Sequence, residues 1–132
     1  FGLAPEPGSI ERAKYYQWVL FLANTLQPAF RTWYYPDEAA GPENAAAAKA
    51  AAERQVEAAW DHIEAHLARR GPYLLGPSVS AADFLLTMLM RWSRNLPRPA
   101  TEWPQLAALA QRMKARPSFR TLYEREGLSE WA

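Results

Sequence analysis

The chain has 132 residues, of which 49% are hydrophobic and 22% are charged, and it contains no Cys. This length is typical of one domain that buries a hydrophobic core of its own, and the hydrophobic share excludes an intrinsically disordered chain. The lack of Cys excludes disulfide bonds, thiolate zinc sites and a Cys nucleophile.

The formal net charge of +1 hides two segments of opposite charge. Residues 36–66 carry seven acidic residues against two basic ones, whereas residues 91–125 carry eight basic residues against two acidic ones. Such a separation can steer an anion or orient a partner. The basic segment lacks interleaved aromatic platforms for nucleic acid, so we expect a solvated helix surface and no nucleic-acid partner. Most of its charge comes from Arg91, Arg94, Arg98, Arg112, Lys114, Arg116 and Arg120.

No apolar run is long enough to span a bilayer. The longest run, residues 84–90, is interrupted by Thr87 and followed by Arg91. The first residues also lack the order of a secretory signal. We therefore expect a cytoplasmic protein with no membrane partner.

Hydrophobic residues recur at the 3.6-residue spacing of helices and no stretch alternates like a strand, which predicts an all-α protein. Residues 1–8 form a lead-in rich in Pro and Gly that resembles a linker. A first helix is predicted from its N-cap Ser9 to about Tyr34, with a kink at Pro28. Its apolar face consists of Tyr15, Trp18, Val19, Leu22, Leu26, Phe30 and Trp33.

A break over residues 35–43 precedes a second long helix. This helix is predicted to begin near Asn44 and to end before Gly71-Pro72, a strong stop signal. Its apolar seam consists of Ala52, Val56, Ala59, Trp60, Ile63 and Leu67.

Two histidines of this helix, His62 and His66, lie one turn apart on one face and could clamp a metal. The intervening Glu64 points to roughly the opposite side, so the pattern is not that of a zinc protease. We interpret both histidines as surface or packing residues and assign no metal site.

Ser80 and Asp83 predict a capping box at the start of a third helix, in which each side chain accepts the other residue's backbone N–H. Val79 and Phe84 can close a hydrophobic staple over this box. The helix is predicted over about residues 81–95 and is apolar on nearly all sides, so we expect it in the middle of a bundle. An acid at this position could be catalytic, but we assign Asp83 the structural role of a cap.

Two shorter helices are predicted at the end of the chain, each with Pro at or near its first position. The first follows Trp103-Pro104, and the second follows Arg116-Pro117 and ends near Gly127. Their apolar faces consist of Leu106, Leu109, Ala110 and Met113 in the first and of Phe119, Leu122 and Tyr123 in the second.

Aromatic residues gather at the start of the first helix. Tyr15 and Tyr16 are adjacent and cannot both face the core. We predict an aromatic-walled cleft for a flat apolar ligand, with Lys14 at its lip, Trp18 beside it and Trp92 at the end of the buried helix.

Several motifs in order along the chain closely resemble the C-terminal helical domain of cytosolic, bacterial-type glutathione transferases. The most specific is Tyr73-Leu74-Leu75-Gly76 followed by the capping box Ser80-Ala81-Ala82-Asp83. Glu11-Arg12-Ala13 with Trp18 resembles the start of that domain's first long helix. Further matches are Trp92, Trp103-Pro104 and Arg116-Pro117-Ser118-Phe119.

The resemblance implies an all-α bundle of about five helices over residues 9–132, with two long antiparallel helices packed around the buried capped helix. It also implies that residues 1–8 are the linker to an absent thioredoxin-like domain, which would bind glutathione and supply the catalytic group. Trp92 matches a residue that borders the electrophile site in bacterial members. No catalytic residue is assigned here, because in the family the other domain supplies the catalytic group. Some bacterial members also place a catalytic-site His near the position of Ala13-Lys14-Tyr15, which this sequence lacks.

We therefore expect the hydrophobic-substrate-binding and dimer-forming domain of a detoxifying bacterial transferase. This chain alone would be inactive, and glutathione would be a co-substrate only when the absent domain is present. The implied partners are that domain, a second copy and an apolar electrophile, with no cofactor. The alternative is a stand-alone module, either for protein interaction or for carrying hydrophobic ligands, and the separated charges and aromatic lip favour it.

Overall fold

The computed structural model describes residues 2–129 and 131, so Phe1 of the predicted lead-in lies outside the described residues. The described part of the chain is helical, as predicted, with one isolated bridge between Tyr73 and Gly76. The helices are α1 (Ile10–Phe21), α2 (Gln27–Tyr34), α3 (Pro36–Ala40), α4 (Ala45–Arg70), α5 (Ala81–Trp92), α6 (Pro104–Lys114) and α7 (Pro117–Glu126).

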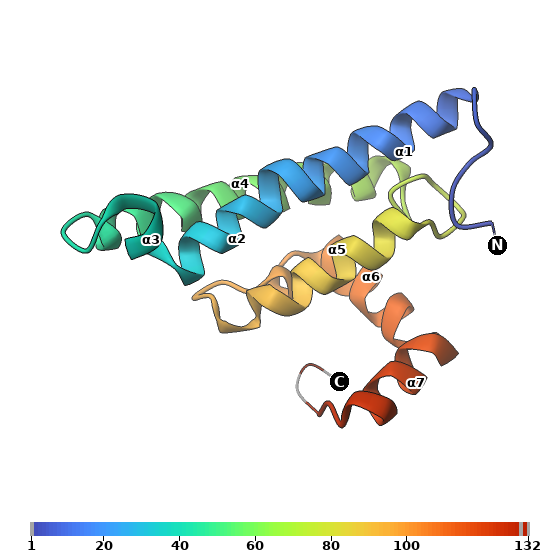
Figure 1. The fold of residues 1–132 in the computed structure, drawn as a ribbon. Helices are drawn as coiled ribbons and strands as arrows, with labels where there is room; N and C mark the ends of the chain where they lie inside the picture. Colours follow the sequence, from blue (N-terminus) through green and yellow to red (C-terminus); the bar gives the residue numbers. More distant parts are fainter. Residues whose placement is uncertain (1, 130, 132) are drawn as a thin grey trace.

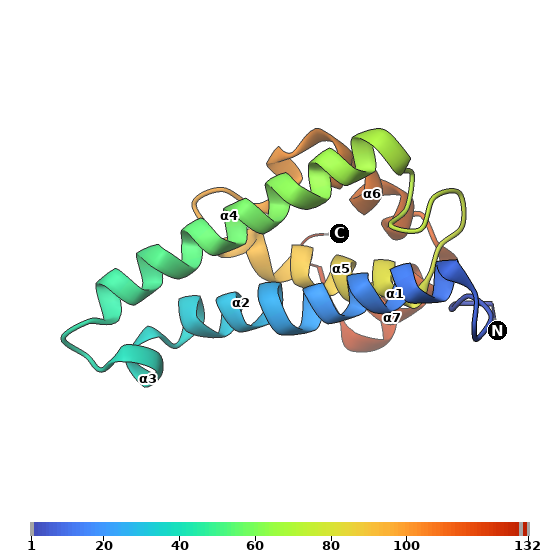
Figure 2. The same cartoon turned by 90° about the horizontal axis from the view of Figure 1, so that it is seen from above.

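The helices form two layers with one outlying helix. The long rod of α1 and α2 runs antiparallel to α4, and α5 lies beneath both of them (Figures 1 and 2). Helix α6 crosses behind α5, and α7 lies farthest from the long helices (Figure 1). The lead-in returns to the start of α5, where the Ala81 N–H donates to the carbonyl oxygen of Leu3 at 2.8 Å.

The core between these layers matches the predicted apolar faces closely. Every residue of the predicted α4 seam is buried, and so are Leu22, Leu26 and Phe30 of the first rod. The largest side chain buried completely is Trp60, whose ring lies 6.1 Å from that of Phe30. The helical period therefore identified which face of each long helix turns inward.

The first rod differs from the prediction near Pro28. Instead of a simple kink, it contains a π-helical turn over Leu22–Leu26, in which the Gln27 N–H donates to the Leu22 carbonyl. A proline has no N–H to donate and its ring crowds the carbonyl four residues earlier. The wider turn ends directly before the proline-containing segment and so accommodates it within one continuous rod.

Three other expectations need correction. The predicted break at 35–43 contains the short helix α3, which begins at Pro36. The third helix ends as an α-helix at Trp92 and continues only as a 3-10 turn over Ser93–Asn95. Met88 is 38% exposed and Leu122 is 50% exposed, because each points into a groove between α5 and α7 that no other described helix covers.

Helix α6 is tied to α4 by acidic side chains. The Glu64 carboxylate accepts the backbone N–H groups of Gln105 at 2.9 Å and Leu106 at 3.1 Å, at the start of α6. These amides have no partner within their own helix, so an acid from α4 takes the place of a cap. The Asp61 carboxylate accepts the indole N–H of Trp103 at 2.7 Å, which fixes the residue before α6.

Ser80 and Asp83 form the predicted capping box at the start of α5. The fully buried Asp83 carboxylate accepts the Ser80 N–H at 2.7 Å and the Ser80 hydroxyl at 2.9 Å. It also accepts the Leu74 N–H at 2.9 Å, a contact beyond the box. Burial raises the pKa of this carboxyl, while the hydrogen bonds oppose that rise. Val79 and Phe84 both pack against the core, as a staple requires.

We expect Asp83→Ala to lower the free energy of unfolding by about 3 kcal/mol, because it leaves two buried N–H donors without an acceptor. Urea unfolding followed by circular dichroism measures the change. Asp37→Ala is a matched control, since Asp37 is an exposed acid in the first turn of α3. A loss equal to that of the control would show that Asp83 does not hold the fold.

Candidate functional site

Three of the five residues of the predicted cleft line two separate cavities. Lys14 and Trp18 line one cavity, which we call the α1–α4 cavity. Trp92 lines another, which we call the Trp92 cavity. Tyr15 and Tyr16 line neither of these two. The described residues therefore do not gather the five predicted positions around one ligand.

The Trp92 cavity, about 510 Å³, lies where α2 meets the end of α5. Aromatic rings from both helices form its walls. The ring of Phe30 meets that of Trp92 edge to face at a centroid distance of 6.0 Å. The cavity is lined by Gln27, Phe30, Arg31, Tyr34, Tyr35, Arg91, Trp92, Arg94 and Asn95.

Hydrogen bonds and a cation–π contact fix the geometry of this cavity. The Tyr34 hydroxyl donates to the Trp92 carbonyl oxygen at 2.7 Å and joins α2 to the end of α5. The Arg31 guanidinium lies over the Tyr35 ring, 4.6 Å from its centroid, and pairs with Glu38. Flat aromatic walls with a few polar groups at the rim suit a flat apolar ligand.

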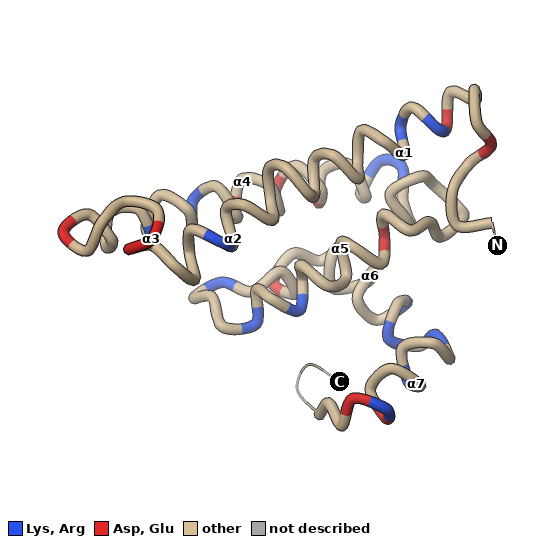
Figure 3. The backbone as a smooth tube through the Cα atoms, in the orientation of Figure 1, with Lys and Arg blue, Asp and Glu red and all other residues tan. Residues whose placement is uncertain are grey.

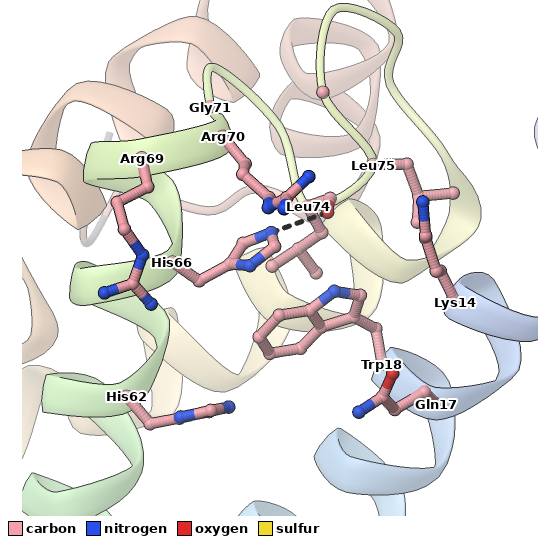
Figure 4. Close-up of a pocket in the computed structure, with 11 residues that line it drawn as sticks. Lys14, Gln17, Trp18, His62, His66, Arg69, Arg70, Gly71, Leu74 and Leu75 are labelled. Carbon is pink, nitrogen blue, oxygen red and sulfur yellow. Dashed lines mark hydrogen bonds between the residues drawn. The ribbon is translucent and has the colours of Figure 1, made fainter. Parts of the chain in front are cut away.

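The α1–α4 cavity is larger, about 710 Å³, and lies between α1, the end of α4 and the following loop (Figure 4). Trp18 stands in its centre against both histidines, with ring centroids 4.6 Å from His66 and 5.6 Å from His62. Lys14 approaches from α1, while Arg69 and Arg70 approach from α4 (Figure 4).

His66 is fixed by a hydrogen bond between its Nε2 and the Leu74 carbonyl oxygen, at 2.9 Å. A carbonyl oxygen can only accept, so Nε2 carries the proton. Burial lowers the pKa of His66, and the charges of Arg70 and Arg69 lower it further, whereas the bond to Leu74 opposes the change. His66 therefore favours its neutral form.

The predicted packing role of the two histidines agrees with these contacts. Both rings lie against Trp18, which confirms that they share one face of α4. Glu64 caps α6 instead of joining them. The described residues contain no group of three or more side chains that could hold a metal.

Tyr15 and Tyr16 point in different directions, as their adjacency requires. Tyr15 packs partly against the core, whereas Tyr16 is 49% exposed. The Arg12 guanidinium lies 5.6 Å from the Tyr15 ring centroid and 4.9 Å from that of Tyr16. This cluster covers the start of α1 and belongs to neither cavity.

Residues 23–125 match the family model described as the glutathione S-transferase, C-terminal domain. The chain belongs to this family.

Known relatives of this glutathione S-transferase C-terminal domain extend well beyond it. A tetrachloro-p-hydroquinone reductive dehalogenase from Sphingobium chlorophenolicum is 40% identical over 74 residues, which are 54% of this chain and 29% of that protein. The bacterial transferase BphK, solved as a ternary complex, matches with a TM-score of 0.82 and 29% identity over 96% of this chain and 60% of its own. A glutathione transferase from Methylococcus capsulatus matches with a TM-score of 0.84 and 30% identity over 97% and 60%.

Two arginines of the basic segment lie over aromatic rings of the domain itself. Arg98 lies 3.7 Å from the Trp103 ring centroid and Arg116 lies 5.5 Å from that of Phe84. Figure 3 shows basic residues around the end of α5 and from the end of α6 into α7, with acidic residues at the α3 end of the molecule. None of the described helices is long and apolar enough to be a membrane span.

Sequence reasoning missed the aromatic partners of Trp92. The sequence places Phe30 in the core, where it is fully buried, and Tyr34 and Tyr35 at the helix end and in the break, without bringing any of the three to Trp92. The available signal was the run of aromatic residues that closes the first helix, Trp33-Tyr34-Tyr35. Three consecutive aromatic residues on a helix point in different directions, so they cannot all face the core.

We expect the domain to lose stability as the pH falls below about 6.5, the ordinary pKa of a His. The lowered pKa of His66 means that the unfolded chain takes up a proton at a higher pH than the folded one. The contribution of His66 to the free energy of unfolding is complete above the pKa of this residue in the unfolded chain. It is lost as the pH falls through the pKa of His66 in the folded chain. Urea midpoints at pH 7.5 and pH 5.5 measure it.

His66→Gln is the matched variant, because Gln can donate to Leu74 but does not titrate. Its midpoint should change less between the two pH values than that of the parent. An equal change in both proteins would remove His66 as the cause.

Proposed function

We propose that this domain binds the apolar electrophile of a glutathione transferase, and that the Trp92 cavity holds it. The single observation that carries the proposal is the aromatic lining around Trp92, the residue that the family resemblance assigns to the edge of the electrophile site. The likeness of the chain to BphK and to the reductive dehalogenase supports a transferase-type parent.

In this proposal the domain contributes positioning, while a thioredoxin-like domain supplies the glutathione thiolate. The Trp92 ring, supported from behind by the buried Phe30, would hold a flat electrophile, and the wall joined by Tyr34 would exclude water from one side of it. Orientation of this kind lowers the entropic cost of attack by the thiolate. No side chain of this domain is required to transfer a proton.

The rest of the parent protein would cover the apolar surface that this domain exposes. Met88 and Leu122 line a groove of about 390 Å³ between α5 and α7, together with Phe84 and Phe119. Exposed apolar patches of this kind mark interaction surfaces. We infer a cytoplasmic, dimeric bacterial protein with a detoxifying role, in which glutathione is a co-substrate.

The product of the complete open reading frame should conjugate glutathione to 1-chloro-2,4-dinitrobenzene, whereas this chain alone should not. The glutathione thiolate attacks the carbon that bears chlorine, a C–S bond forms and chloride leaves. Absorbance of the thioether measures the rate. Inactivity of both proteins would contradict the proposal and favour the interaction or ligand-carrier module.

In the active parent, Tyr35→Ala should lower kcat/KM for the dinitrobenzene about tenfold and leave the KM for glutathione unchanged, because one aromatic wall is lost. Tyr35 is 50% exposed, so the change should not unfold the domain. Leu20→Ala is the matched control on α1, at 56% exposure. A loss in Tyr16→Ala instead would favour the cleft predicted from the sequence.

A further inference from the structure

The Trp92 cavity is lined by cations as well as by aromatic rings. Three of its lining residues are arginines, namely Arg31 of α2, Arg91 in the last turn of α5 and Arg94 in the 3-10 turn that follows. None of the described residues that line it is acidic. An arginine side chain keeps its positive charge in a protein. A cavity lined by one sign of charge favours a ligand of the opposite sign.

Contacts within the domain hold two of these guanidinium groups in place. The Arg31 guanidinium lies over the ring of Tyr35, another lining residue, 4.6 Å from its centroid. Arg94 donates from Nη1 to the Arg91 carbonyl oxygen at 3.1 Å, which holds its side chain against the end of α5. Each of the two helices that form the cavity therefore contributes a cation to its lining.

Negative charge near the cavity offsets only part of this positive charge. The end of α5 carries a partial charge of about half an elementary negative charge. Arg31 pairs with Glu38 of α3, but the two side chains are 66% and 56% exposed, and a pair in water is weak. Glu38 itself does not line the cavity. The three arginines therefore leave the cavity positive even when both sources of negative charge are counted.

We propose that the electrophile held by the Trp92 cavity is an arene that carries an anionic oxygen group, such as a carboxylate. This inference rests on the function proposed above and narrows its substrate class. The ring would lie against Trp92, and the anionic group would accept N–H donors from the arginines, since guanidinium groups bind carboxylate oxygens through paired donors. The cavity volume of about 510 Å³ is in the range of small-molecule sites.

The test compares 4-chloro-3,5-dinitrobenzoate with its methyl ester as substrates of the complete open reading frame's product. The two arenes share the leaving group and both nitro groups, and they differ in the charge of one substituent. In both, the glutathione thiolate attacks the carbon that bears chlorine, a C–S bond forms and chloride leaves with the bonding electrons. Dividing each kcat/KM by the rate constant of the uncatalysed reaction with glutathione removes the difference in intrinsic reactivity.

We expect the corrected kcat/KM to be about tenfold higher for the benzoate, mainly through a lower KM, because a charge-assisted contact forms with the anion alone. This preference should shrink in about 0.5 M NaCl, where exposed charges are screened. A corrected value for the ester that equals or exceeds that of the benzoate overturns the inference and leaves the proposed transferase function standing.

Two variants of one ion pair separate charge recognition from a structural role. Arg31→Gln should lower the preference for the benzoate about threefold, because a lining cation is lost, and Glu38→Gln should raise it about threefold, because a nearby acid is lost. Both changes break the same pair, so a purely structural effect would move the preference in one direction. Arg54→Gln is the matched control, since Arg54 is an exposed arginine of α4 that does not line the cavity.

Binding to this chain without glutathione tests the inference independently of catalysis. The indole N–H NMR signal of Trp92, identified by its loss in Trp92→Phe, should shift at lower concentrations of the benzoate than of the ester. The reverse order, or an equal loss of kcat/KM for both arenes in Arg31→Gln, overturns the inference. Conjugation of neither arene, together with charge-selective binding, would contradict the proposed function and leave the preference for anions intact.

Discussion

The Asp83 carboxylate holds together the parts of the domain on which both cavities depend. It accepts N–H groups from Leu74 and Ser80 and so fixes the loop after α4 to the start of α5. The carbonyl of the same Leu74 accepts the Nε2–H of His66. A single buried acid therefore links α5, the loop and, through the backbone of one residue, Leu74, the last turns of α4. At its other end, α5 presents Trp92, whose carbonyl accepts the Tyr34 hydroxyl.

The capping role of Asp83 could be predicted from the sequence, because it depends on residues close together in the chain. A capping box requires only two residues three positions apart, and Ser80 and Asp83 satisfy it without help from distant segments. The apolar seam of α4 is likewise a property of one helix, and its residues from Ala52 to Leu67 are buried as the period indicates. The contact from Asp83 to Leu74 could not be read in this way, because it depends on the path of the loop between them.

The candidate site was harder to predict, because helical period gives the face of a residue but not its height in the bundle. The start of α5 lies beside the lead-in, through the bond from Ala81 to Leu3. Trp92 lies eleven residues farther along α5, about 17 Å at the rise of an α-helix. It therefore meets Phe30 and Tyr34 of α2 instead of the tyrosines that begin α1. The helical period alone therefore could not show that Trp92 and the tyrosines that begin α1 lie at different heights of the bundle.

The distribution of charge along the sequence also does not show which basic side chains lie together in the fold. The segment 91–125 holds the largest excess of basic residues, yet Arg98 and Arg116 lie over aromatic rings of the domain itself. Lys14 lies far in the sequence from Arg69 and Arg70, outside that segment like them, and the fold brings all three to one cavity. The antiparallel packing of α1 against α4 is responsible, since it places the first turns of one helix beside the last turns of the other (Figure 2). Topology therefore brings together cations that are separated in the sequence.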